Sequence, residues 1–279
     1  MRCDTATNGA RSDHTAVRVL DVDPDLAAGL DRPRREAAAD RLLARSVGAS
    51  KGTLPDKALH VTGPNGLGLL IVEGVIAREL LLGDNVSVEL LGAGDVVQGS
   101  RADDPTRLLR STVRWTVIEP ARFAVLDSAF AAELSAYPEL TSALLGRTVE
   151  RAHRVGVTHA IAQLTGVDRR LLALFWHLAE RWGHVSHAGV EIPLRLPHRI
   201  VAQLIGARRP SVSTALTQLT SRGRLARRVD GGWVLYGEPV GTPTGEVRRV
   251  VRLRRRRVPI ERDAVATPVD RAPRGSARA

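Results

Sequence analysis

The residues best suited to chemistry lie between Leu196 and Leu219, in the run LPHRIVAQLIGARRPSVSTALTQL. Its arginine, histidine, serine and threonine side chains are of the types that donate hydrogen bonds to phosphate oxygens and to base edges. Apolar residues recur at helical spacing on both sides of Gly206, as two short helices joined by a tight turn require. The alternative interpretation is an ordinary helical hairpin whose arginines are only solvated.

Two predicted helices must position these side chains. Val201 precedes the glycine and Leu216 follows it on the apolar faces, together with Ile205, Val212 and Leu219. Ala202 is small enough to let the helices cross closely, and Gly206 can adopt the left-handed conformation of a sharp turn. Burial of the apolar residues leaves one short polar face exposed, which carries Arg209, Pro210, Ser213, Thr214 and Thr217.

The charge of this region favours an anionic partner. No acidic residue occurs between Glu191 and Asp230, whereas the same window contains Arg195, Arg199, Arg208, Arg209, Arg222, Arg224, Arg227 and Arg228. The whole chain of 279 residues has 41 basic and 30 acidic residues, a net charge of +11. Double-stranded DNA is the predicted partner, because neutralising its phosphates releases condensed counterions. Codon usage in a GC-rich genome is an alternative explanation for the excess of arginine over lysine.

The sequence also argues against several classes of protein. Cys3 is the only cysteine, so disulfides, cysteine-based zinc sites and cysteine-ligated iron–sulfur clusters within one chain are excluded. No apolar run reaches the ~18 residues of a membrane span, and the N-terminus lacks a signal-peptide core. Nucleophile elbows, phosphate-binding loops and metal-ligand clusters are missing. We therefore expect a soluble cytoplasmic protein that is not an enzyme and holds neither metal nor cofactor.

The chain divides into five predicted segments. Residues 1–35 lack clear periodicity and are expected to be flexible. Residues 36–136 contain a short helix over 37–47 and then strand-length apolar runs, separated by turn signals at Gly74, Gly83–Asn85 and Gly92–Asp95. This pattern indicates an antiparallel barrel or jelly roll, with two further strands over 110–118 and 122–126.

Helical periodicity begins at Tyr137 and continues to about Thr165. A stripe at three- and four-residue spacing joins Leu140, Leu144, Thr148, Ala152, Val155, Thr158, Ala162 and Thr165, with Leu145, Val149 and Ile161 alongside. A second copy of this helix is the simplest cover for such a stripe, and burial on the same chain is the alternative. Residues 137–165 are thus predicted to form a dimerisation helix, and Asp168 to cap the next helix, which Gly183 ends.

A predicted wing and a basic tail follow the predicted helix pair. Residues 229–235 carry a glycine-containing turn between two short strands, which is typical of the wing of a winged helix. Residues 166–240 are therefore predicted to be a winged helix-turn-helix domain. Residues 241–279 are rich in Pro, Arg and Ala, with seven arginines between Arg248 and Arg257. They are predicted to be a disordered basic tail, either merely solubilising or adding sequence-independent DNA affinity.

This order of segments resembles the CRP/FNR transcription regulators. The similarity is strongest from Asp168 to Leu235 and weaker from Gly66 to Phe130, where the turns at Ile71–Gly74 and Leu90–Asp95 are similar to those of the family's sensor barrel. The resemblance implies an α+β chain: a β-roll or jelly-roll sensor, a long dimerisation helix and a winged helix-turn-helix. It also implies a homodimer on a pseudo-palindromic operator, with RNA polymerase as a partner.

The resemblance implies roles for individual residues of the DNA-binding part. Arg209 matches the arginine that reads a guanine edge, whereas Pro210 and Thr214 differ from the base-reading residues of the best-known member. The operator sequence therefore cannot be transferred. His198, Arg199, Arg208 and Ser211 match positions that hold the phosphate backbone.

The same resemblance disfavours cyclic-nucleotide binding. Nucleotide-binding relatives have a Gly-Glu pair for the ribose and an Arg-Ser or Arg-Thr pair for the cyclic phosphate. The corresponding stretch here, VVQGSRADDPTRLLRST, has no such glutamate, and Asp103 and Asp104 would repel a phosphate. Arg110 and Ser111 are the candidates for a residual phosphate pair, although we prefer to interpret them as the start of a strand.

These observations lead to two competing functions for one fold. The first is a sequence-specific transcription regulator that binds as a homodimer. A signal would reach its winged helices through the long helix and a hinge at Gly166–Asp168. The second is an effector-independent architectural DNA-binding protein that relies on contacts between arginine and phosphate.

Overall fold

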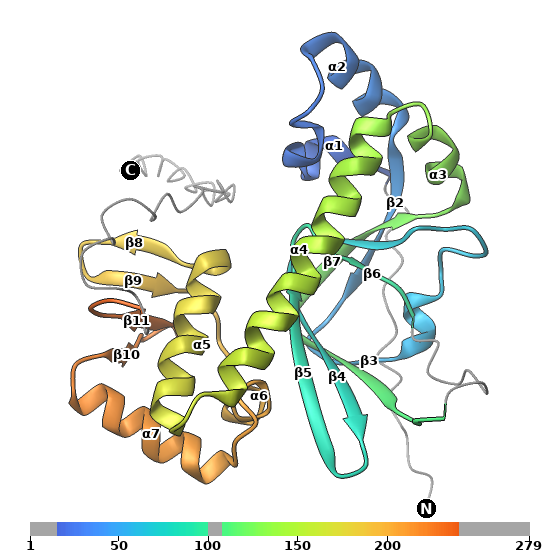
Figure 1. Cartoon of the computed structure of the whole chain (residues 1–279). Coiled ribbons are helices and arrows are strands. Elements are labelled where there is room, and N and C mark those ends of the chain that lie inside the picture. Colours follow the sequence, from blue (N-terminus) through green and yellow to red (C-terminus); the bar gives the residue numbers. More distant parts are fainter. Residues whose placement is uncertain (1–15, 100–107, 240–279) are drawn as a thin grey trace, which may run out of the picture.

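The chain folds into three connected parts, seen in Figure 1 as a sheet-rich body, a long helix and a smaller mixed domain. The computed structural model describes residues 16–99 and 108–239. We call the described part of 16–134 the roll and residues 167–235 the winged helix. Helix α4 (Pro138–Gln163) joins them, running from the N-terminal helices to the winged helix.

The roll is built around two long antiparallel strands, β4 (Gly68–Leu82) and β7 (Thr112–Leu126). Its sheet runs in the order β1-β2-β7-β4-β5, while β3 pairs with β7 and β6 pairs with β4. The shorter strands are β1 (Ala16–Arg18), β2 (Leu43–Ala49), β3 (Gly52–Leu54), β5 (Asn85–Gly92) and β6 (Val96–Val97). A 3-10 turn, η2 (Asp56–Leu59), follows β3.

The interior of the roll is apolar, as its alternating strands require. One buried cluster within the roll contains Ile71, Ile76, Leu91, Trp115 and Phe123. The predicted turn at 83–85 is present, because Leu82 pairs with Asn85 and Gly83 has a φ of 55°. The antiparallel roll that the turn signals indicated is therefore confirmed.

Gly74 was predicted to form a turn between two strands, but the structure shows no turn there. It lies within β4 at a φ of 90°, where the pairing with β7 shifts register. A Cβ at this position would lie 2.3 Å from the carbonyl oxygen of Pro120, so the strands approach too closely for any other residue. The two strands predicted over 110–118 and 122–126 are a single strand, β7, which contains Pro120. The strand can continue through this proline because the pairing with β4 is irregular there.

The N-terminal prediction of a flexible segment over 1–35 is wrong for residues 16–35. This stretch contains β1, α1 (Val19–Val22), η1 (Pro24–Ala27) and the start of α2 (Arg32–Arg41). Val19, Leu20, Leu26 and Leu30 are buried against β4, β7 and the start of α4. Sequence periodicity misses them because β1, α1 and η1 are only three or four residues long. The predicted helix over 37–47 is similarly divided, since α2 ends at Arg41 and β2 begins at Leu43.

Helix α4 follows the short helix α3 (Ser128–Leu134) and presents two different faces. The predicted stripe does not form a single seam: Leu140 and Ile161 are buried within the chain, whereas Leu145 and Val149 are each 65% exposed. Arg147, Arg151 and Arg154 lie on the side toward the roll and pair with its carboxylates. The apolar exposed residues therefore lie on the opposite side, where a partner helix can reach them.

The winged helix begins with α5 (Val167–Trp182), whose buried face includes Leu171, Leu174, Phe175 and Leu178. Its N-cap is Gly166 at a φ of 88°, so the prediction of Asp168 as the cap is wrong by two residues. Asp168 lies instead in the first turn, where a carboxylate is favoured by the helix dipole. Gly183 ends the helix as predicted.

A four-stranded sheet covers the other side of the winged helix in the order β10-β11-β9-β8. These strands are β8 (His184–Ser186), β9 (Gly189–Ile192), β10 (Leu225–Arg227) and β11 (Trp233–Leu235). The Phe175 ring lies 4.9 Å from the Trp233 ring between α5 and the sheet. Among the described residues, no helix is both long and apolar enough to cross a membrane.

Candidate nucleic-acid interface

The predicted helix pair is formed by α6 (His198–Leu204) and α7 (Arg209–Ser221). Gly206 has a φ of 60° in the turn between them, and the amide of Ala207 donates to the carbonyl of Ala202 at 2.9 Å. Every apolar residue predicted to hold the two helices together is buried: Val201, Ala202, Ile205, Val212, Leu216 and Leu219. The local fold therefore follows from the sequence, because apolar spacing and turn glycine agree.

Helix α7 exposes a polar surface along its length. Arg209, Pro210, Thr214 and Thr217 are exposed, as are the adjoining Arg208 and Ser211, whereas Ser213 is half-buried. The hydroxyls of Ser213, Thr214 and Thr217 donate to carbonyls one turn earlier, at 3.3, 3.2 and 3.1 Å. In this arrangement the threonines offer acceptor lone pairs and methyl groups to a ligand, and Arg209 offers the donors.

Ser213 is partly covered because it contacts His198. The Nδ1 atom of His198 lies 3.2 Å from the Ser213 hydroxyl, and its Nε2 atom lies 3.5 Å from the Arg227 guanidinium on β10. Burial lowers the pKa of His198 below its usual 6.5, and the charges of Arg227 and Arg209 lower it further. The neutral imidazole can donate to Ser213 and accept from Arg227, so it joins α6, α7 and the wing.

The wing turn is fixed by Asp230. Its Oδ1 atom accepts from the amide of Gly232 at 2.9 Å, and its carboxylate accepts from the Arg228 side chain at 3.2 and 3.1 Å. The hydrogen bond from Gly232 lowers the pKa of Asp230, and the charge of Arg228 adds to this effect. Sequence reasoning overlooked Arg227 as a site residue, although its position at the predicted wing inside an acid-free window was a usable signal.

Arg199, for which the resemblance implied a phosphate contact, reaches the roll. Its guanidinium donates to both oxygens of Glu79 on β4, at 3.0 and 3.1 Å, and to Gln203 at 3.0 Å. The side chain remains 47% exposed. Arg199 thus contacts the roll. The other predicted residues lie on or beside the exposed side of the helix pair: His198, Arg208, Arg209, Pro210, Ser211, Ser213, Thr214 and Thr217.

A carboxylate that is remote in the sequence also borders α7. Asp168 and Val167, from the first turn of α5, line an open hollow of about 340 Å³ with Ser211, Thr214, Ala215 and Gln218. The acid-free window of the sequence does not include Asp168, so only the folded chain reveals it. Asp168 also pairs with Arg222 at 3.5 Å, so this carboxylate offsets part of the positive charge at the end of α7.

The candidate effector pair lies on the roll, where the start of β7 pairs with the end of β4. Arg110 is exposed and Ser111 is half-buried, and both directly precede β7. The arginines of α4 that face the roll already have carboxylate partners. Arg147 pairs with Asp23, Arg151 with Glu89 at 2.6 Å, and Arg154 with Asp95 at 2.7 Å. Among the described residues, no group of three His, Cys, Asp or Glu side chains is placed to hold a metal ion.

Comparisons with known proteins agree with this geometry. The Crp-like helix-turn-helix domain family matches residues 169–235. No curated protein sequence matches the chain.

Several solved structures share the fold at low sequence identity. A double mutant of CooA from Carboxydothermus hydrogenoformans is 17% identical with a TM-score of 0.52, over 81% of this chain and 93% of that one. FixK2 from Bradyrhizobium japonicum is 18% identical with a TM-score of 0.53, over 70% and 93% of the two chains. The c-di-GMP-responsive regulator CLP of Xanthomonas campestris is 20% identical with a TM-score of 0.51, over 70% and 95%.

These similarities extend across the roll, α4 and the winged helix. Residues 169–235 are a Crp-like helix-turn-helix domain, and with the preceding roll and connecting helix they give the chain the fold of the CRP/FNR transcription regulators.

Proposed function

We propose that the protein is a sequence-specific transcription regulator that binds a pseudo-palindromic DNA site as a homodimer. The observation that carries this proposal is the exposed surface of α7, which includes Arg209, Thr214 and Thr217 on a Crp-like helix-turn-helix. A helix of this kind enters the major groove, where an arginine can bond a guanine edge with two donors. Arg208, Ser211 and His198 are placed around it to contact phosphates.

The exposed side of α4 supports a second copy as the dimer partner. Leu145, Val149 and Val155 are large apolar residues that remain exposed on one 26-residue helix. Packing such a helix against its own copy removes this apolar surface from water. A two-fold axis along α4 would present two recognition helices to successive major grooves, about 34 Å apart.

An effector-independent architectural DNA-binding protein remains the alternative. The observation that favours it is the pairing of Arg147, Arg151 and Arg154 with carboxylates of the same chain. These arginines are already neutralised, so an anionic effector would have to displace Asp23, Glu89 or Asp95 to reach them. RNA polymerase as a partner and a cytoplasmic location stay predictions of the resemblance and of the sequence.

Selection of genomic fragments with purified full-length protein at physiological salt tests the proposal. We expect a recurring inverted repeat among the retained fragments. Diffuse enrichment at every salt concentration would contradict sequence-specific binding and favour the architectural alternative, since phosphate contacts carry no sequence information.

Two neighbouring arginines provide the matched comparison on the selected site. Arg209→Ala is expected to cost ~1–3 kcal/mol on the selected sequence and to relax preference at one base pair. Arg208→Ala is expected to weaken binding to all sequences alike and to reduce the salt slope by about one. Equal losses on selected and random DNA for Arg209→Ala would refute its role as a base-reading residue.

A further inference from the structure

The winged helix and the roll share one apolar core. Val75, Ala77, Val88, Leu90 and Ile118 of the roll belong to the same buried cluster as the residues that hold the winged helix together. Helix α6 contacts β5 directly, and Figure 1 shows α6 beside the β4–β5 hairpin. Two packed domains with a continuous core move as one body, unlike domains that are joined only by a flexible linker.

Glu79 provides a polar anchor at the edge of this core. Its side chain is fully buried in β4, and it accepts from the Thr116 hydroxyl at 3.0 Å and from Nε of Arg114 at 3.1 Å, both on β7. The third donor is Arg199 of α6, which reaches across the boundary with two hydrogen bonds. A bidentate arginine–carboxylate pair fixes direction as well as distance, because both groups are planar.

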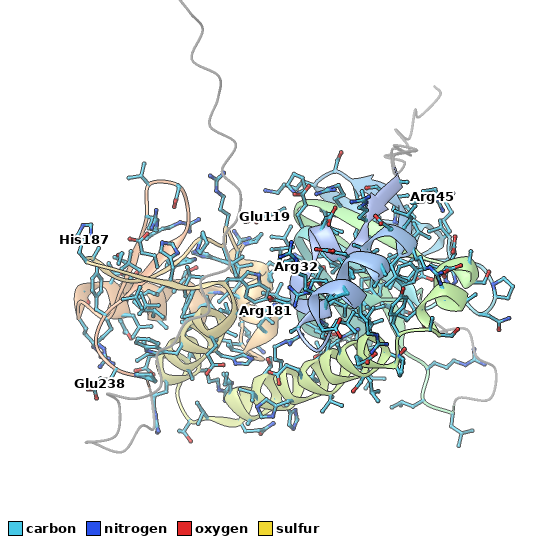
Figure 2. All side chains as sticks on the ribbon, turned by 90° about the horizontal axis from the view of Figure 1, so that it is seen from above. Arg32, Arg45, Glu119, Arg181, His187 and Glu238 are labelled. Atoms are coloured by element: carbon cyan, nitrogen blue, oxygen red, sulfur yellow. The ribbon has the colours of Figure 1, made fainter. Side chains whose placement is uncertain are left out.

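A second anchor lies at the end of α5. Arg181 pairs with Asp95 of the roll at 2.7 Å and donates to the carbonyls of Gly92 and Ala93, each at 3.1 Å. The Trp182 ring covers Gly92 so closely that a Cβ on this glycine would lie 3.1 Å from Nε1. Figure 2 shows Arg181 at the junction of the winged helix and the roll. The two anchors hold α5 and α6 at different points, which restricts rotation as well as separation.

The Glu79–Arg199 contact can open without leaving the buried carboxylate of Glu79 unpaired. If Arg199 leaves, Glu79 keeps Arg114 and Thr116 as partners, and Arg199 is already 47% exposed to solvent. The large penalty for an unpaired buried carboxylate therefore does not apply. The contact contributes to the orientation of the winged helix, whereas the roll retains its own pairing.

We propose that Glu79 is a positioning residue for DNA recognition: through Arg199 it fixes the angle of the helix pair to the roll and thereby sets the permitted spacing between half-sites. This inference rests on the proposed function. In a homodimer joined along α4, the separation of two recognition helices depends on how each winged helix sits against its own roll. One extra base pair moves the half-sites apart by ~3.4 Å and rotates them by roughly 35°, so a fixed angle accepts few spacings.

The experiment measures binding to a series of operators that differ only in the number of base pairs between the half-sites. The proteins are the wild type, Glu79→Gln, Arg199→Gln and the double variant, all as full-length chains. We expect the wild type to lose about tenfold in affinity when the spacing changes by two base pairs, and the variants to lose no more than about threefold. The double variant should match the single variants, because both remove the same contact.

Arg114→Gln is the matched control. It removes a partner of Glu79 that belongs to the roll and leaves the bond to Arg199 in place, so we expect it to keep the spacing preference of the wild type. A phosphate-binding role for Arg199 would instead lower affinity equally at every spacing, independently of Glu79. That pattern, or an unchanged spacing preference in both single variants, would overturn the inference.

A measurement without DNA separates this inference from the proposed function. Val61 and Val185 are exposed, so each can be replaced by cysteine and spin-labelled in a protein whose Cys3 is replaced by serine. Pulsed electron paramagnetic resonance then measures the distance between the label on the roll and the label on the winged helix. We expect a narrow distribution in the wild type and a broader one in Glu79→Gln and Arg199→Gln. A narrow wild-type distribution without sequence-selective DNA binding would refute the proposed function alone. Equal widths in all proteins would refute positioning by Glu79.

Discussion

Arg199 and Glu79 form a bidentate ion pair, with N–O distances of 3.0 and 3.1 Å, across the boundary between the winged helix and the roll. The two residues lie 120 positions apart in the chain. Burial alone would raise the pKa of Glu79, but the hydrogen bonds from Arg199, Arg114 and Thr116 outweigh burial and lower it below 4.5. The carboxylate is therefore ionised at neutral pH, as a charge-assisted pair with Arg199 requires.

Replacing Glu79 by glutamine is expected to lower the free energy of unfolding at pH 7 by ~1–3 kcal/mol, because charge-assisted hydrogen bonds within the roll and to α6 are lost. A group whose pKa is lowered by folding stabilises the protein above its unfolded pKa and loses this contribution as the pH falls through the folded value. The difference between wild type and variant should therefore shrink below about pH 4.5. Urea unfolding at several pH values measures it.

Glu73→Gln is the control for this prediction, since Glu73 lies on the same strand and pairs with Arg122 at 3.0 Å on the surface. An exposed pair of this kind contributes only about 0–1 kcal/mol. Equal losses in the two variants would show that the buried position of Glu79 confers no special stability.

Charge on the exposed side of α4 is expected to break the proposed homodimer. Leu145→Glu and Val149→Glu place carboxylates where two helices would meet, and the two negative charges would repel each other in an apolar seam. We expect sedimentation or light scattering to show monomers for both variants at concentrations where the wild type is dimeric. Binding to the full inverted repeat should fall with dimerisation.

Val185→Glu is the matched substitution outside α4, because Val185 is 60% exposed on β8. It should leave the oligomeric state unchanged. Dimers that persist in both α4 variants would place the subunit interface elsewhere on the protein.

His198 is expected to make DNA binding pH-dependent. Its pKa is lowered by burial and by Arg227 and Arg209, so the free protein carries it neutral at pH 7. A phosphate at this surface would offset the arginine charges and raise the pKa, so binding would take up a proton and strengthen as the pH falls. We expect a gain of about threefold in affinity between pH 7.5 and 6, measured by fluorescence anisotropy at constant ionic strength.

His198→Gln should abolish most of this dependence, whereas His187→Gln should preserve it. His187 is exposed and lies at the outer edge of the winged helix in Figure 2. Because folding lowers the pKa of His198, neutral His198 stabilises the fold above pH 6.5 and this contribution is lost on acidification. Measurements should therefore stay at pH 6 or above. An identical pH profile for wild type and His198→Gln would disprove the coupling.

Gly206→Ala is expected to destabilise the winged helix by ~1–2 kcal/mol, since a left-handed backbone is costly for any residue with a Cβ. The effect should come from backbone strain alone, because the added Cβ would lie 4.0 Å from its nearest neighbour, Ala162. Thermal unfolding measures the loss.

Gly146→Ala provides the opposite expectation. Gly146 lies inside α4, and a Cβ added there would enter open space, so alanine should stabilise the helix by ~0.5–1 kcal/mol. If Gly206→Ala proved as stabilising as Gly146→Ala, the left-handed turn would be refuted.

The sequence was most informative where structure is local. The helix pair around Gly206, the hairpin at Gly83 and the end of α5 at Gly183 follow from apolar spacing and from residues with special backbone preferences. The N-terminal stretch over 16–35 was mispredicted because its elements are too short for periodicity, and their burial depends on the distant start of α4. The bulge at Gly74 was interpreted as a turn because a positive φ serves both purposes.

The sequence by itself determined the exposed polar surface of α7, since Arg209, Thr214 and Thr217 belong to one short helix whose exposed side is fixed by its buried side. Only the tertiary structure decided which arginines of this region pair with carboxylates of the roll. Arg199 and Arg209 are both exposed arginines of the same acid-free window, but folding brings the buried Glu79 carboxylate to Arg199 and leaves Arg209 at the start of α7. Charge pairing between distant strands and helices depends on three-dimensional distance, and spacing along the chain carries no record of it.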